Sequence, residues 1–153
     1  MSKPFSLQPL VQLAHQKNDA ATRKLGQLNR QQQTAQDKLD ALQQYRRDYQ
    51  LKFQEAAQQG MEPTDLRNFQ DFINRLDQAI RQQQHVIEKA KTGVQTGRNE
   101  LMDSTRKMKS FDTLAQRHVE SEMKLEAKSE QRLQDEQTGR FAAQHAADKR
   151  GEK

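Results

Sequence analysis

The side chains that could support catalysis or metal binding are few and widely spaced in this sequence. Its 153 residues include no cysteine and four histidines, at His15, His85, His118 and His145. No two histidines are three or four positions apart, the spacing that places two imidazoles on one helical face to bind a metal ion. A phosphate-binding loop of the G-x-x-x-x-G-K-[ST] type is also absent. The sequence therefore predicts a non-enzymatic protein without a metal or a cofactor.

The composition predicts long, exposed helices instead of a globular core. Hydrophobic residues make up 32% of the chain, below the roughly 45–50% of ordinary globular domains. The 25 glutamines, together with many alanine, lysine, arginine and glutamate residues, favour helix. Prolines occur only at positions 4, 9 and 63, so nothing interrupts a helix between residues 10 and 57 or from residue 66 onward.

Composition also bears on location and on partners. No apolar run approaches the ~20 residues that a transmembrane helix needs, and the N-terminus lacks the apolar centre of a signal peptide. Together with the lack of cysteine, these features predict a cytoplasmic protein. The net charge of +5 comes from basic residues interspersed with acids, so we expect no nucleic-acid partner.

Two columns of apolar residues recur every seven positions. The stronger column contains Leu66, Ile73, Ile80, Ile87, Val94, Leu101, Met108 and Ala115. A weaker, alanine-rich column contains Leu7, Ala14, Ala21, Leu28, Ala35, Leu42, Tyr49 and Ala56. A sustained period of seven is typical of helices wound against each other.

The segment between the columns predicts that the two helices are antiparallel neighbours. Gly60 can end the first helix in a left-handed conformation, and Pro63 suits the start of the second. A connection this short brings the helices back alongside each other, with Leu25 opposite Gly97. The same register sets Phe53 opposite Phe69, Arg46 opposite Leu76 and Asn18 opposite Ser104. In this register large side chains face small ones, as close packing requires. The packing is expected to end where Leu7 lies opposite Ala115.

The predicted fold is therefore all-α, a long antiparallel two-helix coiled-coil hairpin with a C-terminal helical overhang. It forms one domain over residues 1–153, with helices at about 7–57 and 66–138, a loop at 58–65 and a disordered tail at 139–153. The glycines at positions 93 and 97 are expected to allow close packing of the helices.

Aromatic residues widen the apolar stripe near the loop. Tyr45, Phe72 and Ala79 fall beside the seam and predict a partly exposed apolar face, which is typical of an interaction site. The alternative is that they only cover the seam. Arg46, at a seam position, is expected to extend along this face instead of forming a pair in the interior.

The same region resembles the FliJ family, the coiled-coil component of the flagellar type III export apparatus. The resemblance is sharpest over residues 39–80 and rests on Tyr45 and Tyr49, followed by the Asn-Phe-Gln-Asp-Phe-Ile segment at residues 68–73. The chain departs from the family at Gln83, where the family often has histidine.

The resemblance implies a stalk similar to the central stalk subunit of rotary ATPases. Such a subunit inserts into the hexameric export ATPase, promotes ring assembly, contacts the cytoplasmic domain of the membrane export gate and escorts export chaperones. This implies a cytoplasmic protein, peripherally associated with the inner membrane at the flagellar base, with a role in motility and chemotaxis. By resemblance, residues 1–20 and 110–140 face the ATPase. The matching gate surface, called here the predicted gate surface, consists of Leu42, Tyr45, Tyr49, Phe72, Leu76 and Ala79.

Three alternatives stay open from the sequence. They are a homodimeric structural spacer, the equivalent stalk of a virulence-type secretion system and a nucleic-acid-binding rod.

Overall fold

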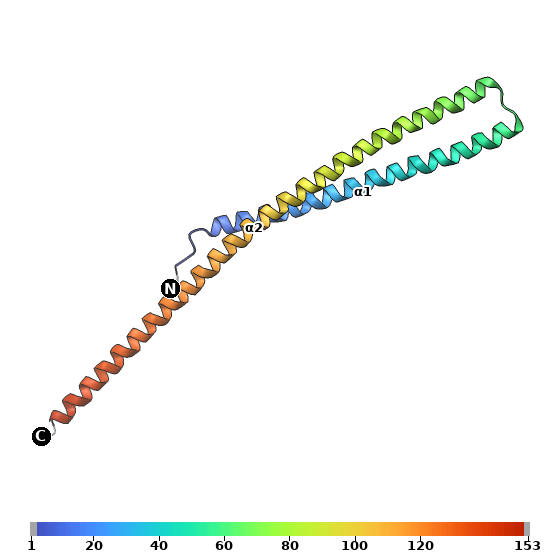
Figure 1. Cartoon of the computed structure of the whole chain (residues 1–153). Coiled ribbons are helices and arrows are strands. Elements are labelled where there is room, and N and C mark those ends of the chain that lie inside the picture. Colours follow the sequence, from blue (N-terminus) through green and yellow to red (C-terminus); the bar gives the residue numbers. More distant parts are fainter. Residues whose placement is uncertain (1–2, 152–153) are drawn as a thin grey trace. The chain divides into compact units, whose positions relative to one another are not determined.

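The computed structural model describes residues 3–151, which contain two long helices (Figure 1). Helix α1 runs over Gln8–Gln59 and helix α2 over Pro63–Gly151. The two helices pack antiparallel as a hairpin, which confirms the predicted fold class. Compared with the predicted bounds, α1 ends two residues later, and α2 begins at Pro63 instead of at residue 66.

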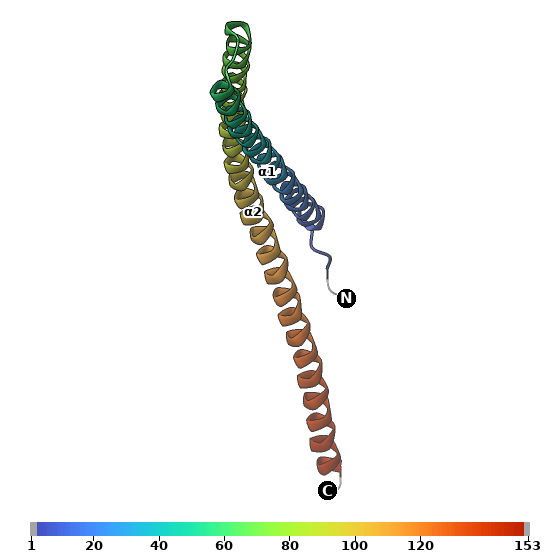
Figure 2. The ribbon, with the colours of Figure 1, turned by 90° about the vertical axis from the view of Figure 1, so that its right-hand side faces the viewer.

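The chain reverses over residues 60–62, and Figure 2 views the hairpin from this end. Gly60 has a φ of 91°, a left-handed conformation that glycine adopts without a steric penalty. Its amide donates a hydrogen bond of 3.2 Å to the Ala57 carbonyl and so satisfies one terminal group of α1. Pro63 begins α2, and the Asp65 carboxylate in the first turn complements the positive end of the helix dipole.

Backbone contacts divide the chain into two compact units, although the sequence indicated one domain. Residues 17–105 form one unit, called here the loop unit. The other, the terminal unit, contains residues up to Gln16 and from Arg106 onward. Each unit includes part of α1 and part of α2.

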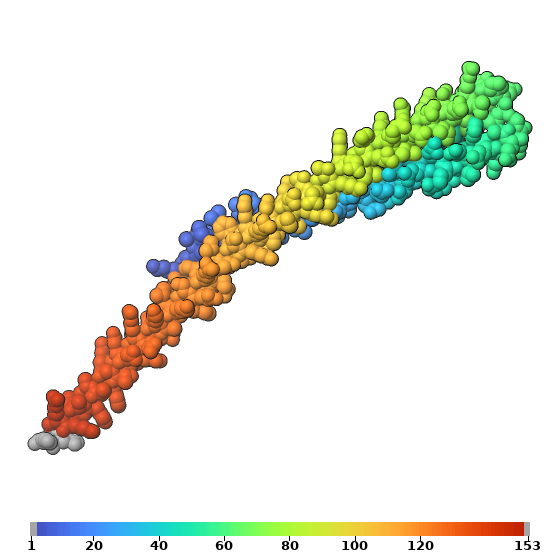
Figure 3. All heavy atoms as spheres, in the orientation of Figure 1, coloured from blue at the N-terminus to red at the C-terminus, as the bar shows by residue number. Residues whose placement is uncertain are grey.

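The seam of the loop unit follows the predicted register. Ala35, Leu39 and Ile87 form a buried cluster against which Ile80 packs. Side chains of both helices close the space that the ribbon leaves between them near the loop (Figure 3). Among the described residues no large side chain is less than 2% exposed, because two helices alone cannot surround a residue completely.

The helices approach each other closely at the glycines of α2. A Cβ atom added at Gly97 would lie 2.8 Å from Leu28 Cδ1 and 3.5 Å from Leu25 Cδ1. At Gly93 the nearest atom would be Leu28 Cδ2, at 3.6 Å. The predicted packing role, with Leu25 opposite Gly97, is therefore confirmed for Gly97, whereas a Cβ at Gly93 would make only an ordinary contact.

In the terminal unit the packing continues beyond Ala115, so the predicted end of the seam is wrong. The rings of Phe5 and His118 lie 5.3 Å apart, and His118 Nε2 donates a hydrogen bond of 2.8 Å to the Lys3 carbonyl. The Lys3 amide also lies 3.4 Å from Glu122 Oε2. Non-helical backbone advances about 3.3 Å per residue against about 1.5 Å in a helix, so a few residues before α1 cover a further stretch of α2.

The rest of α2 in this unit is helical and exposed from residue 123 to Gly151. The overhang expected at residues 116–138 is thus present as helix. The tail after residue 138 was expected to be disordered, but helix continues to Gly151. Residues 152–153 lie outside the described part. Several alanines and no proline in this segment favour the helix.

The close contact at Gly97 yields a stability prediction. Replacement Gly97→Val should lower the free energy of unfolding by about 1–3 kcal/mol, because a branched side chain would collide with Leu28 and Leu25. Urea denaturation followed by circular dichroism measures this change. Gly139→Val is the matched control, since a Cβ at Gly139 meets nothing within 4 Å. Equal stabilities of the two variants would contradict the packing role.

Candidate partner-binding surface

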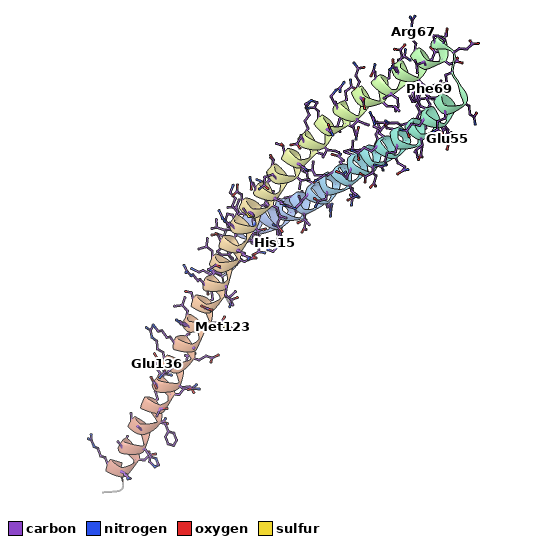
Figure 4. The ribbon with its side chains drawn as sticks, turned by 45° about the vertical axis from the view of Figure 1, so that its right-hand side comes forward. His15, Glu55, Arg67, Phe69, Met123 and Glu136 are labelled. Carbon is purple, nitrogen blue, oxygen red and sulfur yellow. The ribbon has the colours of Figure 1, made fainter. Side chains whose placement is uncertain are left out.

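Five aromatic rings form a continuous cluster between α1 and α2 in the loop unit. Tyr49 lies at its centre, with ring centroids 4.3 Å from Phe72 and 4.8 Å from Phe69. Tyr45 makes an edge contact with Phe72 at 6.0 Å, and Phe53 lies 5.2 Å from Phe69. Figure 4 shows Phe69 between the two helices near the loop. These five residues are called the aromatic cluster.

Helical spacing explains how the aromatic cluster forms. Tyr45, Tyr49 and Phe53 follow each other at intervals of four, which places them along one face of α1. Phe69 and Phe72, three apart, share a face of α2, and the register sets this face against α1. Offset and edge contacts between aromatic rings contribute roughly 0.5–1.5 kcal/mol per pair beyond burial.

The predicted gate surface contains side chains of very different accessibility. Tyr45 is 53% exposed, whereas Leu76 is 7% exposed and lies in the seam. Leu42, Tyr49, Phe72 and Ala79 are half-buried. Ring contacts join Tyr45, Tyr49 and Phe72 directly, and Tyr45 is the most exposed of the three.

Arg46 forms an ion pair with Asp77, and both side chains stay partly exposed instead of pairing in the interior. Its Nε donates to Asp77 Oδ1 at 2.6 Å, and its Nη2 lies 3.5 Å from Asp77 Oδ2. A further bond of 2.9 Å joins its Nη1 to Gln50 Oε1. Both charged side chains are 32% exposed. The hydrogen bond that the Arg46 guanidinium donates to Asp77, and then the negative charge of Asp77, raise the pKa of Arg46, while partial burial opposes this rise.

The register explains this ion pair. Arg46 was predicted opposite Leu76, and Asp77 is the next residue on α2. A guanidinium at a seam position can therefore turn sideways to a carboxylate, whose two oxygens match its fork of donors. Asp77, which follows the residue facing Arg46, was the signal in the sequence that could have revealed this ion pair.

Two other polar seam residues find partners within the loop unit. Gln83 is buried, and its Nε2 donates a hydrogen bond of 2.9 Å to the Ala35 carbonyl. This bond satisfies a buried amide and holds the side chain in the seam. Asn18 was predicted opposite Ser104, but its Nδ2 donates to the neighbouring Thr105 Oγ1 at 2.8 Å.

The histidines occupy separate surroundings in the structure. In the terminal unit, His15 Nε2 lies 2.8 Å from Asp112 Oδ1 and the His145 ring stacks beside Phe141. Within residues 3–151, no three histidine, cysteine, aspartate or glutamate side chains gather closely enough to hold a metal ion.

Sequence reasoning missed part of the aromatic cluster. Phe53 and Phe69 were predicted to form a seam layer and were left out of the gate surface. Tyr49 and Phe69 also border a surface hollow that Met61 of the loop helps to line. The interval of four from Tyr49 to Phe53 was the signal that could have extended the site toward the loop.

The fold and this surface define a helical coiled-coil protein that offers an exposed aromatic face. Comparison with known families identifies the family: the one described as "Flagellar FliJ protein" matches residues 2–148. The chain belongs to the FliJ family, as its sequence predicted.

Two relatives show how far the similarity extends. The Flagellar FliJ protein of Escherichia coli (strain K12) is 26% identical over 142 residues, which cover 93% of this chain and 97% of the relative. The Flagellar FliJ protein of Salmonella typhi shows the same identity and coverage. No solved structure matches the chain.

Family membership makes the chain a component of flagellar export. The FliJ family is non-enzymatic, which agrees with the prediction from the sequence. Over the described residues, neither helix includes a stretch long and apolar enough to cross a membrane.

The Arg46 ion pair yields a second stability prediction. Asp77→Asn should lower the free energy of unfolding by up to about 1 kcal/mol, as is typical for partly exposed pairs. The loss should shrink at high salt, where the charges are screened. Urea denaturation at two salt concentrations measures both effects. Asp71→Asn, an exposed acid on the same helix, is the control, and an equal loss in it would show that the pair contributes nothing specific.

Proposed function

We propose that this chain is a stalk and chaperone-escort subunit of the flagellar export apparatus. It inserts into the export ATPase ring, promotes ring assembly and couples the ring to the membrane export gate. Membership of the FliJ family and the antiparallel helical hairpin support this proposal. The observation that carries it is the partly exposed aromatic cluster, because a non-enzymatic member of an export machine acts through the surfaces it presents.

The gate-binding site in this proposal is the predicted gate surface in the loop unit. Tyr45, Tyr49 and Phe72 provide a rigid apolar surface, and burying such rings gives the large contributions that dominate many interfaces. The Arg46–Asp77 ion pair lies beside them and limits the freedom of both polar side chains before binding. The partner is the cytoplasmic domain of the export gate protein.

The ATPase-binding site in this proposal is residues 1–20 and 110–140, most of which belong to the terminal unit. Exposed apolar side chains of α2 support this assignment, because no residue of α1 covers them. They include Met123, Leu125 and Leu133. With the export chaperones as further partners, the chain works in the cytoplasm, at the inner-membrane face of the flagellar base.

The gate assignment predicts the effect of removing two rings of the predicted gate surface, the exposed Tyr45 and the half-buried Phe72. The double substitution Tyr45→Ala and Phe72→Ala should weaken binding to the cytoplasmic domain of the gate by about 10- to 100-fold. Isothermal titration calorimetry on the full chain measures the affinity, and circular dichroism checks that helicity is kept. Leu51→Ala is the control, because Leu51 is 59% exposed on α1 and has no place in the aromatic cluster. Unchanged gate binding by the double variant would overturn the assignment.

The stalk assignment predicts that the full chain stimulates the export ATPase. Adding the chain should increase both hexamer formation, measured by analytical ultracentrifugation, and ATP turnover. The variant with Tyr45→Ala and Phe72→Ala should stimulate equally, because its changes lie in the loop unit. An ATPase that neither assembles nor turns over faster would rule out the stalk role.

A further inference from the structure

Residues 3–7 form a non-helical segment, called here the strap, that contacts α2 before α1 begins. Pro4 fixes its own φ and disfavours helix at Lys3, so the backbone at this end favours an extended form. The Gln8 amide donates a hydrogen bond of 3.1 Å to the Phe5 carbonyl, and a turn at residues 6–7 thus joins the strap to α1. The strap and the part of α2 that it contacts both belong to the terminal unit.

The strap covers the face of α2 that continues the seam past the start of α1. Ala115, His118 and Glu122 follow each other at intervals of three and four, which places them on one side of the helix. All three are half-buried, whereas α2 is exposed from residue 123 onward. Phe5 packs on the His118 ring, and the Lys3 backbone bonds to His118 and Glu122. The strap thus occupies the place that α1 takes on the preceding turns of α2.

The strap is attached more weakly than the start of α1. Within residues 3–151, two hydrogen bonds join it to α2, and both are exposed to water. The one from the Lys3 amide to Glu122 Oε2 is 3.4 Å long, beyond the usual range, and bonds that compete with water contribute little. In α1, by contrast, Val11 and Ala14 are buried. The strap can therefore leave α2 while α1 stays packed.

We propose that the strap is a displaceable cover over part of the ATPase-binding site. This proposal rests on the proposed function, in which residues 110–140 bind the ATPase. A segment of the ATPase that lies along the face of His118 and Glu122 must displace the strap, because both use the same surface. The intrinsic affinity for the ATPase is then reduced in proportion to the fraction of molecules whose strap is released.

The test fixes the strap in place and measures binding of the full chain to the export ATPase. Because the chain has no cysteine, Lys3→Cys with Glu122→Cys introduces two unique thiols, which a short bifunctional maleimide joins. The same variant with both thiols capped by N-ethylmaleimide is the matched control. Cross-linking should weaken ATPase binding at least about tenfold relative to this control, because the strap can no longer leave. Isothermal titration calorimetry measures the affinity, and circular dichroism verifies that helicity is kept.

A second variant makes the opposite change and releases the strap. Phe5→Ala removes the ring contact with His118. It should tighten ATPase binding about two- to tenfold, up to the limit that complete release sets. Leu51→Ala, outside the terminal unit, is the control and should bind like the unchanged chain.

The two measurements together decide the proposal. Weaker binding after cross-linking, together with tighter binding by Phe5→Ala, supports it. Equal binding by the cross-linked and capped chains overturns it and leaves the proposed function standing. Unchanged or weaker binding by Phe5→Ala also overturns it, because the strap would then not compete with the ATPase. If the unchanged chain does not bind the ATPase at all, the proposed function fails and the strap proposal fails with it.

Discussion

Contact between α1 and α2 is the constraint on which the structure depends, because the described chain offers neither helix another element to pack against. Helix propensity alone would give an isolated helix with so few apolar residues little stability. The shared seam supplies the missing burial, but it buries side chains only partly. Two polar residues within it, Gln83 and Arg46, bond to the facing helix.

Much of this architecture could be predicted from the sequence. A period of seven in two segments, separated by Gly60 and Pro63, specified the helices, their direction and their register. The contact of Gly97 with Leu25 follows from that register alone. Such predictions succeed because apolar periodicity and turn chemistry are local properties of the chain.

Other features depend on side-chain choices that periodicity does not encode. Arg46 turns toward Asp77 because a carboxylate happens to stand next to the facing position. Packing of Phe5 on His118 depends on how the non-helical residues before α1 run along α2. Of the gate surface, the grouping of Tyr45 with Phe72 could be foreseen, whereas the burial of Leu76 required the structure.

The bond between Gln83 and Ala35 has a consequence for how the sequence can change. Its acceptor is a main-chain oxygen, which every amino acid provides. Position 35 can therefore vary in side chain without removing the acceptor, provided that the new residue still fits beside Ile87. To keep this hydrogen bond, only the side chain at position 83, on α2, has to be conserved. Two polar side chains facing each other, such as Asn18 and Thr105, would have to change together.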